Sequence, residues 1–384
     1  MLDNGKAEGV RKIKRFEKYC LKDIATVSQG FTFSRLYQGK KNLKWNYFKV
    51  ADIGLNPNSK YLTNAINTIS DITMEEIGAL PFPKGSIVFP RVGAALFNNN
   101  KKILAQDGVV DDNVLVLTVT DTSKCWYEFL YYYLQGIPLA KWCNSGLVPV
   151  INTKTVLSQM VFLPPLPEQQ KITTILSTQD KVIELKEKLL AQKQQQKKYL
   201  MQQLLTGKKR LSGFNEKWRF AKLENVSKYS ASAASFKTYE SHLGCGPYPV
   251  YDATGCFGNI DFYENEQPYI SIVKDGAGAG RVALCKEKSS TIGTLGCIFA
   301  NDIDLLYLFY CMSAVDFQIY SNGSTIPHVY YKDYKNMVLY LPCELEQKAI
   351  VEILSAADHE IDLLQKSIEA EKQKKKALMQ LLLT

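Results

Sequence analysis

Hydrophobic residues follow two different periods along this chain, and the change of period divides it into segments. In 163–206, and again in 341–384, leucine and isoleucine recur at steps of four and three residues, which is typical of a helix that buries one narrow stripe. The stripe consists of Ile172, Leu176, Ile183, Leu190, Leu200 and Leu204 in the first segment and of Ile350, Leu354, Ile361, Leu364, Ile368, Leu378 and Leu382 in the second. The pattern predicts two long helices, and one that spans 168–206 would extend ~58 Å at ~1.5 Å per residue.

The two segments are copies of each other. When 163–206 is aligned with 341–384 without a gap, 21 of the 44 residues are identical at a constant offset of 178 positions, which indicates an internal duplication. Fainter matches lie upstream: NSGLVPVINTK (144–154) with NGSTIPHVYYK (322–332), and IVFPRVGA (87–94) with ISIVKDGA (270–277). The chain therefore has the order globular unit, helix, globular unit, helix.

The regions outside the helices have the pattern of short strands. In the second region, runs rich in Val, Ile, Tyr and Phe alternate with glycine turns, and VKDGAGAGRV (273–282) predicts two strands joined by a glycine-rich turn. YEFLYYYLQ (127–135) and LLYLFYCM (305–312) have helical spacing and are predicted to lie in the core. We expect mixed α/β domains and helical spacers with these bounds: domains at 1–160 and 218–338, helices at 161–206 and 339–384, and a linker at 207–217.

The distribution of charge favours antiparallel pairing of the two helices. Each is acidic in its first half and basic near its end, so a parallel pair would set Lys197 beside Lys375. An antiparallel pair instead sets each basic end near the other helix's acidic half, where each exposed ion pair contributes only ~0.5–1 kcal/mol but several act together. The expected α+β architecture is two α/β domains joined and separated by a pair of long antiparallel coiled-coil helices, with pseudo-two-fold symmetry. Two unrelated surface helices are the alternative.

The composition of the chain indicates the kind of partner it binds and the cellular compartment in which it acts. The formal net charge of +9 favours an anionic partner. Nine cysteines without a CxxC pair suit free thiols in a reducing cytoplasm, and neither a signal peptide nor an apolar run of ~20 residues is evident. We therefore expect a cytoplasmic protein.

Basic and amide side chains near predicted turns are candidates for DNA contact. Lys and Arg bind phosphate or guanine, and Asn pairs with adenine. The candidates are Arg91, Asn98, Asn99, Asn100, Lys101 and Lys102 in the first region and Lys274 and Arg281 in the second. Plain structural or solvated turns remain the alternatives for both loops.

Motifs for catalysis are missing from the sequence. The prolines of LPPLP (163–167) lack the Asn or Asp of an adenine methyltransferase motif, and the chain has no phosphate-binding GxxxxGK[ST] loop. His242, Cys245 and Cys256 offer a partial zinc set without a fourth ligand at suitable spacing. We predict no catalytic residues and no metal site in this chain.

The paired sequences LPPLPEQQKI…ILS…D…LMQQLLTG and LPCELEQ…ILS…D…LMQ resemble the specificity subunit of type I restriction-modification systems over essentially the whole chain. LPCELEQ departs from LPPLPEQ in the second copy. The resemblance implies two target-recognition domains that each read one half of a bipartite asymmetric DNA sequence. It also implies that the helices set the spacer and dock two methyltransferase subunits, which are joined by endonuclease/translocase subunits.

In such a complex this chain is not an enzyme. The resemblance implies that adenine N6 methylation and cleavage belong to the partner subunits, which bind S-adenosylmethionine, ATP and Mg. From the residues alone, a non-catalytic coiled-coil scaffold whose two modules bind protein is the alternative.

Overall fold

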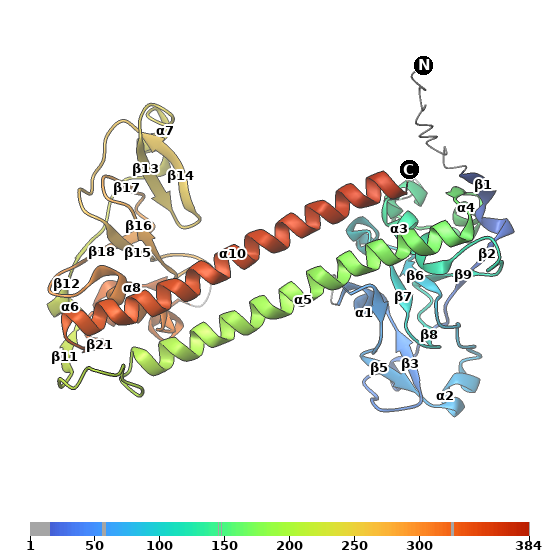
Figure 1. The fold of residues 1–384 in the computed structure, drawn as a ribbon, viewed down its shortest axis with the longest axis horizontal. Helices are drawn as coiled ribbons and strands as arrows, with labels where there is room; N and C mark the ends of the chain where they lie inside the picture. The colour runs from blue at the N-terminus through green and yellow to red at the C-terminus, as the bar shows by residue number, and fades with distance from the viewer. Residues whose placement is uncertain (1–15, 56–58, 145, 147, 324–325, 384) are drawn as a thin grey trace, which may run out of the picture. The chain divides into compact units, whose positions relative to one another are not determined.

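The computed structural model describes residues 16–55, 59–144, 146, 148–323 and 326–383, and these form two compact units (Figure 1). Unit 1 comprises Met1–Lys188 together with Ser367–Thr384, and unit 2 comprises Leu189–Lys366. Each unit contains a globular part and portions of two long helices. The fold is mixed α/β.

The two long helices have equal lengths. Helix α5 is Leu166–Leu204 and helix α10 is Glu344–Leu382, each of 39 residues, which confirms both predicted helices. Every residue of the predicted stripe is buried or half-buried. After α5, Gly207 has a φ of 69°, and a side chain there would also press on the ring of Trp218. Glycine is therefore suited to the end of this helix on two counts.

The globular part of unit 1 contains three sheets. A five-stranded sheet has the order β2-β9-β6-β7-β4, a three-stranded sheet has the order β5-β3-β8, and β1 pairs antiparallel with β10. The strands are β1 Glu17–Cys20, β2 Ala25–Gln29, β3 Trp45–Phe48, β4 Tyr61–Leu62, β5 Asn67–Ile69, β6 Ile87–Pro90, β7 Lys102–Leu104, β8 Val109–Val110, β9 Val114–Val119 and β10 Met160–Leu163. The α-helices are α1 Val50–Gly54, α2 Asp71–Glu76, α3 Tyr127–Gln135 and α4 Thr153–Leu157. Short 3-10 turns lie at Leu21–Asp23, Arg35–Tyr37, Ala94–Asn98 and Leu139–Trp142.

The globular part of unit 2 has a comparable plan. A four-stranded sheet has the order β12-β18-β15-β16, a three-stranded sheet has the order β14-β13-β17, and two further strand pairs are β11-β21 and β19-β20. The strands are β11 Arg219–Lys222, β12 Ser227–Ser230, β13 Tyr248–Asp252, β14 Gly255–Ile260, β15 Tyr269–Val273, β16 Val282–Cys285, β17 Ser290–Thr291, β18 Leu295–Ala300, β19 Ser321–Asn322, β20 His328–Val329 and β21 Val338–Leu341. The helices are α6 Leu223–Val226, α7 Phe236–Glu240, α8 Leu305–Ser313 and α9 Tyr331–Tyr334, with a 3-10 turn at Phe317–Tyr320. The two strands predicted around the glycine-rich turn are confirmed as the antiparallel pair β15-β16.

Helices α3 and α8 occupy equivalent places in the two sequence copies. Each has nine residues, and their first residues, Tyr127 and Leu305, are 178 positions apart. Most of their aromatic and aliphatic side chains are buried, which confirms the prediction that these segments belong to the core.

The ends of the long helices are part of the cores they meet. In unit 1, Ile172 and Leu176 of α5 share a cluster with Leu382 at the end of α10 and with Leu383 just after it. In unit 2, Leu204 at the end of α5 shares a cluster with Leu354 of α10 and the adjacent Ile350. Burial of such side chains contributes ~1.5–3 kcal/mol each, so the helix ends are held by packing in their unit. Among the described residues, no helix is both long and apolar enough to cross a bilayer.

Candidate functional site

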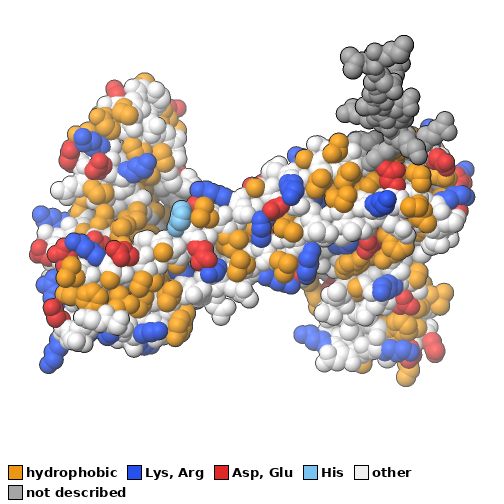
Figure 2. Space-filling view, in the orientation of Figure 1, with side chains coloured by type: hydrophobic (Ala, Val, Ile, Leu, Met, Phe, Trp, Pro, Cys, Tyr) orange, Lys and Arg blue, Asp and Glu red, His pale blue; other side chains and the backbone are white. Residues whose placement is uncertain are grey.

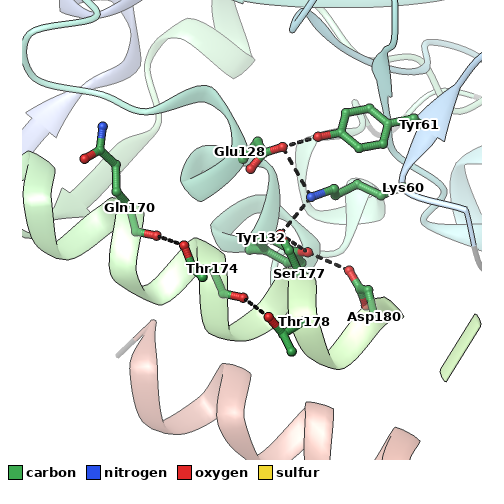
Figure 3. Close-up of polar contacts among 9 residues, drawn as sticks. All are labelled: Lys60, Tyr61, Glu128, Tyr132, Gln170, Thr174, Ser177, Thr178 and Asp180. Carbon is green, nitrogen blue, oxygen red and sulfur yellow. Dashed lines mark hydrogen bonds and ion pairs between the residues drawn. The ribbon is translucent and has the colours of Figure 1, made fainter. Parts of the chain in front are cut away.

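A polar junction connects α3 to α5 in unit 1 (Figure 3), and α10 joins it through Lys375. The buried hydroxyl group of Tyr132 donates to Asp180 over 2.6 Å and lies 3.3 Å from the hydroxyl of Ser177. The ammonium of Lys375, on α10, lies 2.6 Å from the other oxygen of Asp180 and over the Tyr132 ring at 5.9 Å. One carboxylate therefore holds α3, α5 and α10 together within this unit.

A second lysine extends this junction to the sheet. Lys60 immediately precedes β4, and its ammonium donates to Ser177 over 2.9 Å and lies 3.3 Å from Glu128 of α3. The hydroxyl of Tyr61 also donates to Glu128 (Figure 3). Because Lys60 and Glu128 are largely buried, with side chains 11% and 15% exposed, each depends on the other to offset its desolvation.

Unit 2 contains the same junction at an offset of 178 residues. The hydroxyl of Tyr310 donates to Asp358 over 2.8 Å and lies 3.1 Å from Ser355. Lys197 of α5 forms an ion pair with Asp358 and lies over the Tyr310 ring at 5.4 Å. The duplication therefore extends from sequence to individual side-chain contacts.

Burial acts on both tyrosine hydroxyl groups. It raises the pKa of Tyr310 to about 12, and it raises the pKa of Tyr132 further, with the nearby Asp180 charge acting in the same direction. Both hydroxyl groups are therefore protonated at neutral pH and serve as hydrogen-bond donors.

The glutamine of each EQ motif fixes the start of its long helix. Gln169 accepts a bond from the backbone N–H of Trp126 and donates to the carbonyl of Pro164. At the same offset, Gln347 accepts from the N–H of Asp304 and donates to Pro342. In each copy the buried side-chain amide uses both its oxygen and its nitrogen in hydrogen bonds to backbone, which explains why the two copies share this residue.

The glutamate of the second EQ motif binds the segment that follows α5. Glu346 is fully buried, and the guanidinium of Arg210 meets it with two bonds, of 2.7 and 2.9 Å. The indole N–H of Trp218 donates to the same carboxylate over 2.9 Å. These bonds hold Arg210 of the predicted linker 207–217, and Trp218 directly after it, against α10 within unit 2.

Ion pairs connect the portions of α5 and α10 within each unit. As the residue numbers on α5 increase, those of the paired residues on α10 decrease, so the two helices are antiparallel within each unit. In unit 1, Asp180 pairs with Lys375 and Glu187 pairs with Lys372. The pairs of unit 2 are Lys193 with Glu360 and Lys197 with Asp358. These contacts match the charge complementarity expected from the sequence.

The loop at 96–104 differs from its prediction, which assumed exposed amides and lysines. Lys101 and Lys102 are each only 2% exposed. The Lys101 ammonium donates to Asn99 over 2.7 Å and to the carbonyl of Ile137 over 2.9 Å, whereas Lys102 donates to the carbonyl of Ser59. Burial lowers the pKa of Lys101 to about 7 and that of Lys102 to about 8. The expectation that these two ammonium groups bind phosphate or guanine of DNA is wrong, because both are buried and donate to carbonyl and amide oxygens inside the protein.

The asparagines of this loop are divided between the interior and the surface. Asn99 has a φ of 54° and accepts a bond from the N–H of Leu139, so it shapes the turn. Asn98 is exposed and Asn100 is half-buried. Asn98 and Asn100 stay candidates for DNA contact.

The remaining basic candidates lie at strand ends. Arg91 follows β6 and donates weakly to the carbonyl of Asp112 over 3.5 Å. Lys274 follows β15 and is half-buried, and Arg281 precedes β16 and is exposed. The glycine-rich turn between them has positive φ at Gly276 and Gly280. Their contact with DNA stays a prediction.

The described part of the chain has no cluster of side chains suited to a metal ion, and two of its buried thiols are protonated. No group of three or more His, Cys, Asp or Glu in this part of the chain could hold a metal ion. His242, one of the partial zinc set, lies 2.9 Å from Asp261 instead. Burial raises the pKa of Cys125 and of Cys311 to about 12, so both thiols are protonated and unreactive.

Sequence reasoning missed Tyr132, Tyr310, Lys60 and Arg210 as members of these sites. Tyr132 and Tyr310 could have been found, because they are identical at the offset of the duplication and each precedes its Asp by 48 positions. No comparable signal marks Lys60, since residue 238, its counterpart at that offset, is a threonine.

Comparison with known proteins agrees with this architecture. The model of the type I restriction modification DNA specificity domain matches residues 13–195 and 215–372. A putative type I restriction enzyme MjaX specificity subunit from Methanocaldococcus jannaschii is 25% identical over 398 residues, covering 95% of this chain and 92% of that protein. The MjaVIII specificity subunit of the same organism is 37% identical over 131 residues, covering 33% of this chain and 30% of that protein.

Solved structures show the same fold. The crystal structure of the type I restriction-modification system S subunit from M. genitalium has a TM-score of 0.64 at 14% identity, covering 98% of both chains. A chain from a study of assembly and conformational transition in the type I R-M system has a TM-score of 0.57 at 14% identity, covering 96% of both chains. Because the family model matches both copies of the duplicated sequence, this chain belongs to the family of type I restriction-modification specificity subunits.

Proposed function

We propose that this chain is the DNA-reading, non-catalytic subunit of a restriction-modification complex. The globular part of each unit reads one half of a bipartite asymmetric target in double-stranded DNA. The long helices form an antiparallel coiled coil that sets the spacer between the half-sites. They also dock two methyltransferase subunits, which endonuclease/translocase subunits join. We place the protein in the cytoplasm, where it binds cellular DNA.

One observation carries this proposal: the junction of Tyr, Ser, Asp and Lys occurs twice, at the same offset. A duplicated anchor attaches each globular part to the helices in the same local manner. Two similar readers on one scaffold suit a target with two separate halves, as in other two-fold DNA-binding proteins. The net charge of +9 favours DNA as the partner.

Chemistry is assigned to the partners. S-adenosylmethionine, ATP and Mg are bound by the methyltransferase and restriction subunits, which carry out adenine N6 methylation and cleavage. In this chain the charged side chains at the junctions form ion pairs with one another, which suits a role in stabilising the fold. The alternative, a protein-binding scaffold, predicts no sequence-dependent binding of DNA by the assembled complex.

The test is an exchange of one reader in the assembled complex. Residues 218–338 are replaced by the counterpart from a relative with a different target, and methylated adenines are mapped in cells. We expect one half of the methylated sequence to change and the other half to stay. Replacement of 1–160 should change the opposite half. A change of both halves in either exchange, or methylation that does not depend on this chain, would overturn the proposal.

A further inference from the structure

The two units share one local arrangement of backbone at the end of a central strand. In unit 1, the N–H of Ile151 bonds to the carbonyl of Arg91 at 2.9 Å, and the N–H of Gly93 bonds to Pro149 at 3.0 Å. The same bonds in unit 2 are Val329 to Lys274, 2.8 Å, and Gly276 to Pro327, 3.0 Å. Each arrangement encloses one antiparallel bridge, Val92 with Val150 in unit 1 and Asp275 with His328 in unit 2.

The side chains at this shared bridge differ completely in chemistry. Unit 1 has two valines, whereas in unit 2 the imidazole Nδ1 of His328 lies 2.7 Å from a carboxylate oxygen of Asp275. The backbone does not need the polar pair, because valines form the same bridge with the same flanking bonds. An exposed pair of this kind also contributes little to stability, and these side chains are 34% and 39% exposed. The difference therefore requires an explanation other than folding.

The surroundings of the polar pair are those of a nucleic-acid contact. The ring of His328 stacks parallel to the exposed ring of Tyr330, with 3° between the planes and 5.8 Å between the centroids. The ammonium of Lys332 lies over the Tyr330 ring at 5.5 Å. Lys274 is adjacent to Asp275 in the chain, and the exposed Arg281 is at the other end of the glycine-rich turn. Positive charge beside flat, exposed rings is suited to phosphates and bases.

We propose that His328, oriented by Asp275, contacts a base edge in the half-site read by unit 2. This inference rests on the proposed function and names the residues that make the two half-sites different. Asp275 occupies Nδ1, which leaves Nε2 as the polar atom of the ring that can meet the DNA. With Nδ1–H donated to the carboxylate, Nε2 of the neutral ring accepts a bond from the amino group of adenine or cytosine in the major groove. Asp275 is a positioning residue, because it acts through the imidazole.

The experiment uses the natural comparison between the units. The double variant Asp275→Val with His328→Val gives unit 2 the side chains that unit 1 has at this bridge. Because unit 1 forms the same backbone bonds with valines, we expect unit 2 to keep its own bonds in the variant. The variant chain replaces the native one in cells, and methylated sequences are mapped. We expect the half-site of unit 1 and the spacer to be unchanged. At one position of the other half-site, discrimination between bases should fall about tenfold or more.

Two further variants make the result decisive. Asp275→Val alone should relax the same position to a smaller extent, because the ring stays but loses its orientation. His242→Val with Asp261→Val removes another exposed His–Asp pair of unit 2, 2.9 Å apart and outside the bridge, and should leave the methylated sequence unaltered. If the first double variant proves unstable, Val92→Asp with Val150→His in unit 1 replaces it. A changed base preference is then expected in the half-site that unit 1 reads.

The outcomes separate this inference from the proposed function. An unaltered methylated sequence in both bridge variants would overturn the role of His328 while leaving the proposed function intact. A slower reaction with the same sequence would likewise mean that the bridge is structural. If the native chain directs no methylation, the proposed function itself fails.

Discussion

The hydroxyl group of Tyr132 donates a hydrogen bond to Asp180 over 2.6 Å, inside a junction where the tyrosine ring is fully buried. Asp180 uses its second oxygen for Lys375. A hydrogen bond between buried groups is costly to break. The partner that remains stays out of contact with water and no longer has the hydrogen bond that offset this loss of hydration.

Tyr132→Phe should therefore lower the free energy of unfolding by ~1.5–3 kcal/mol, as for loss of a bond to a charged acceptor. Tyr310→Phe should have a similar effect through Asp358. Denaturant unfolding of the purified chain measures both. Tyr133→Phe is the matched control on the same helix, with its side chain half-buried. Equal stabilities of the Tyr132 and Tyr133 variants would contradict the role of the junction.

The pairing of Asp180 with Lys375 can be tested by exchange of charge. Asp180→Lys or Lys375→Asp alone sets like charges together and should destabilise the protein, whereas the double exchange should recover ~0.5–1 kcal/mol relative to the sum of the single effects. The side chains are 19% and 29% exposed, so water screens part of the interaction. Asp358 and Lys197 offer the same cycle in unit 2. Strict additivity of the single changes would show that the two charges do not interact.

The buried Lys101 should make stability depend on pH. Its pKa is lowered to about 7 in the folded chain, so between about pH 7 and its ordinary pKa of 10.5 the unfolded state binds the additional proton. Stability should then rise as pH increases through this window. Lys101→Met should make the rise shallower and leave the part that comes from Lys102, whose pKa burial lowers to about 8. The denaturant midpoint from pH 7 to 8.5 provides the measurement, below the range in which buried thiols such as Cys125, with a pKa raised to about 12, act in the opposite direction.

The control for this titration is the exposed Lys141, changed to Met in the same way. Its variant should keep the pH dependence of the native chain. A Lys101→Met variant with the native slope would mean that Lys101 keeps its proton when the chain folds.

The proposed coiled coil should measure the distance between the half-sites. Four residues inserted after Lys188 and four after Lys366 lengthen both helices by ~6 Å and rotate them by ~400°, which leaves a net turn of only ~40°. Methylation mapping should then show both half-sites unchanged and a spacer longer by one or two base pairs.

The same four residues inserted after Gly213, outside the long helices, provide the control and should leave the spacer as it was. A native spacer in the doubly lengthened protein would mean that the helices connect the readers without setting their separation.

The long helices were predictable because their information is periodic and duplicated. Ile172 and Leu176 stand four residues apart, as do their counterparts Ile350 and Leu354, and this spacing is typical of a helix. The identities at offset 178 predict that the two copies have the same structure. The strands around 273–282 were predictable for a similar reason, since glycines interrupt a run of β-forming residues.

The error at Lys101 shows where sequence reasoning stops. Two adjacent lysines after three asparagines are typical of an exposed loop, yet here the lysines bond to Asn99 and to the carbonyls of Ile137 and Ser59. Two of these partners lie more than 30 residues away, and pairing over such distances leaves no local pattern. The bridge of Asp275 with His328 was hidden in the same manner, although both residues lay inside the aligned stretches.

The packing of Leu378, Leu382 and Leu383 against the core of unit 1 has a consequence for biosynthesis. Unit 2 is one continuous stretch of chain, whereas unit 1 needs residues from both sides of it. On the ribosome, unit 2 can thus complete its core while unit 1 still waits for its last helical turns. A product released a few turns early would carry a finished unit 2 and an open hydrophobic seam in unit 1. Because exposed hydrophobic surface is what chaperones and proteases detect, we expect such incomplete chains to be removed.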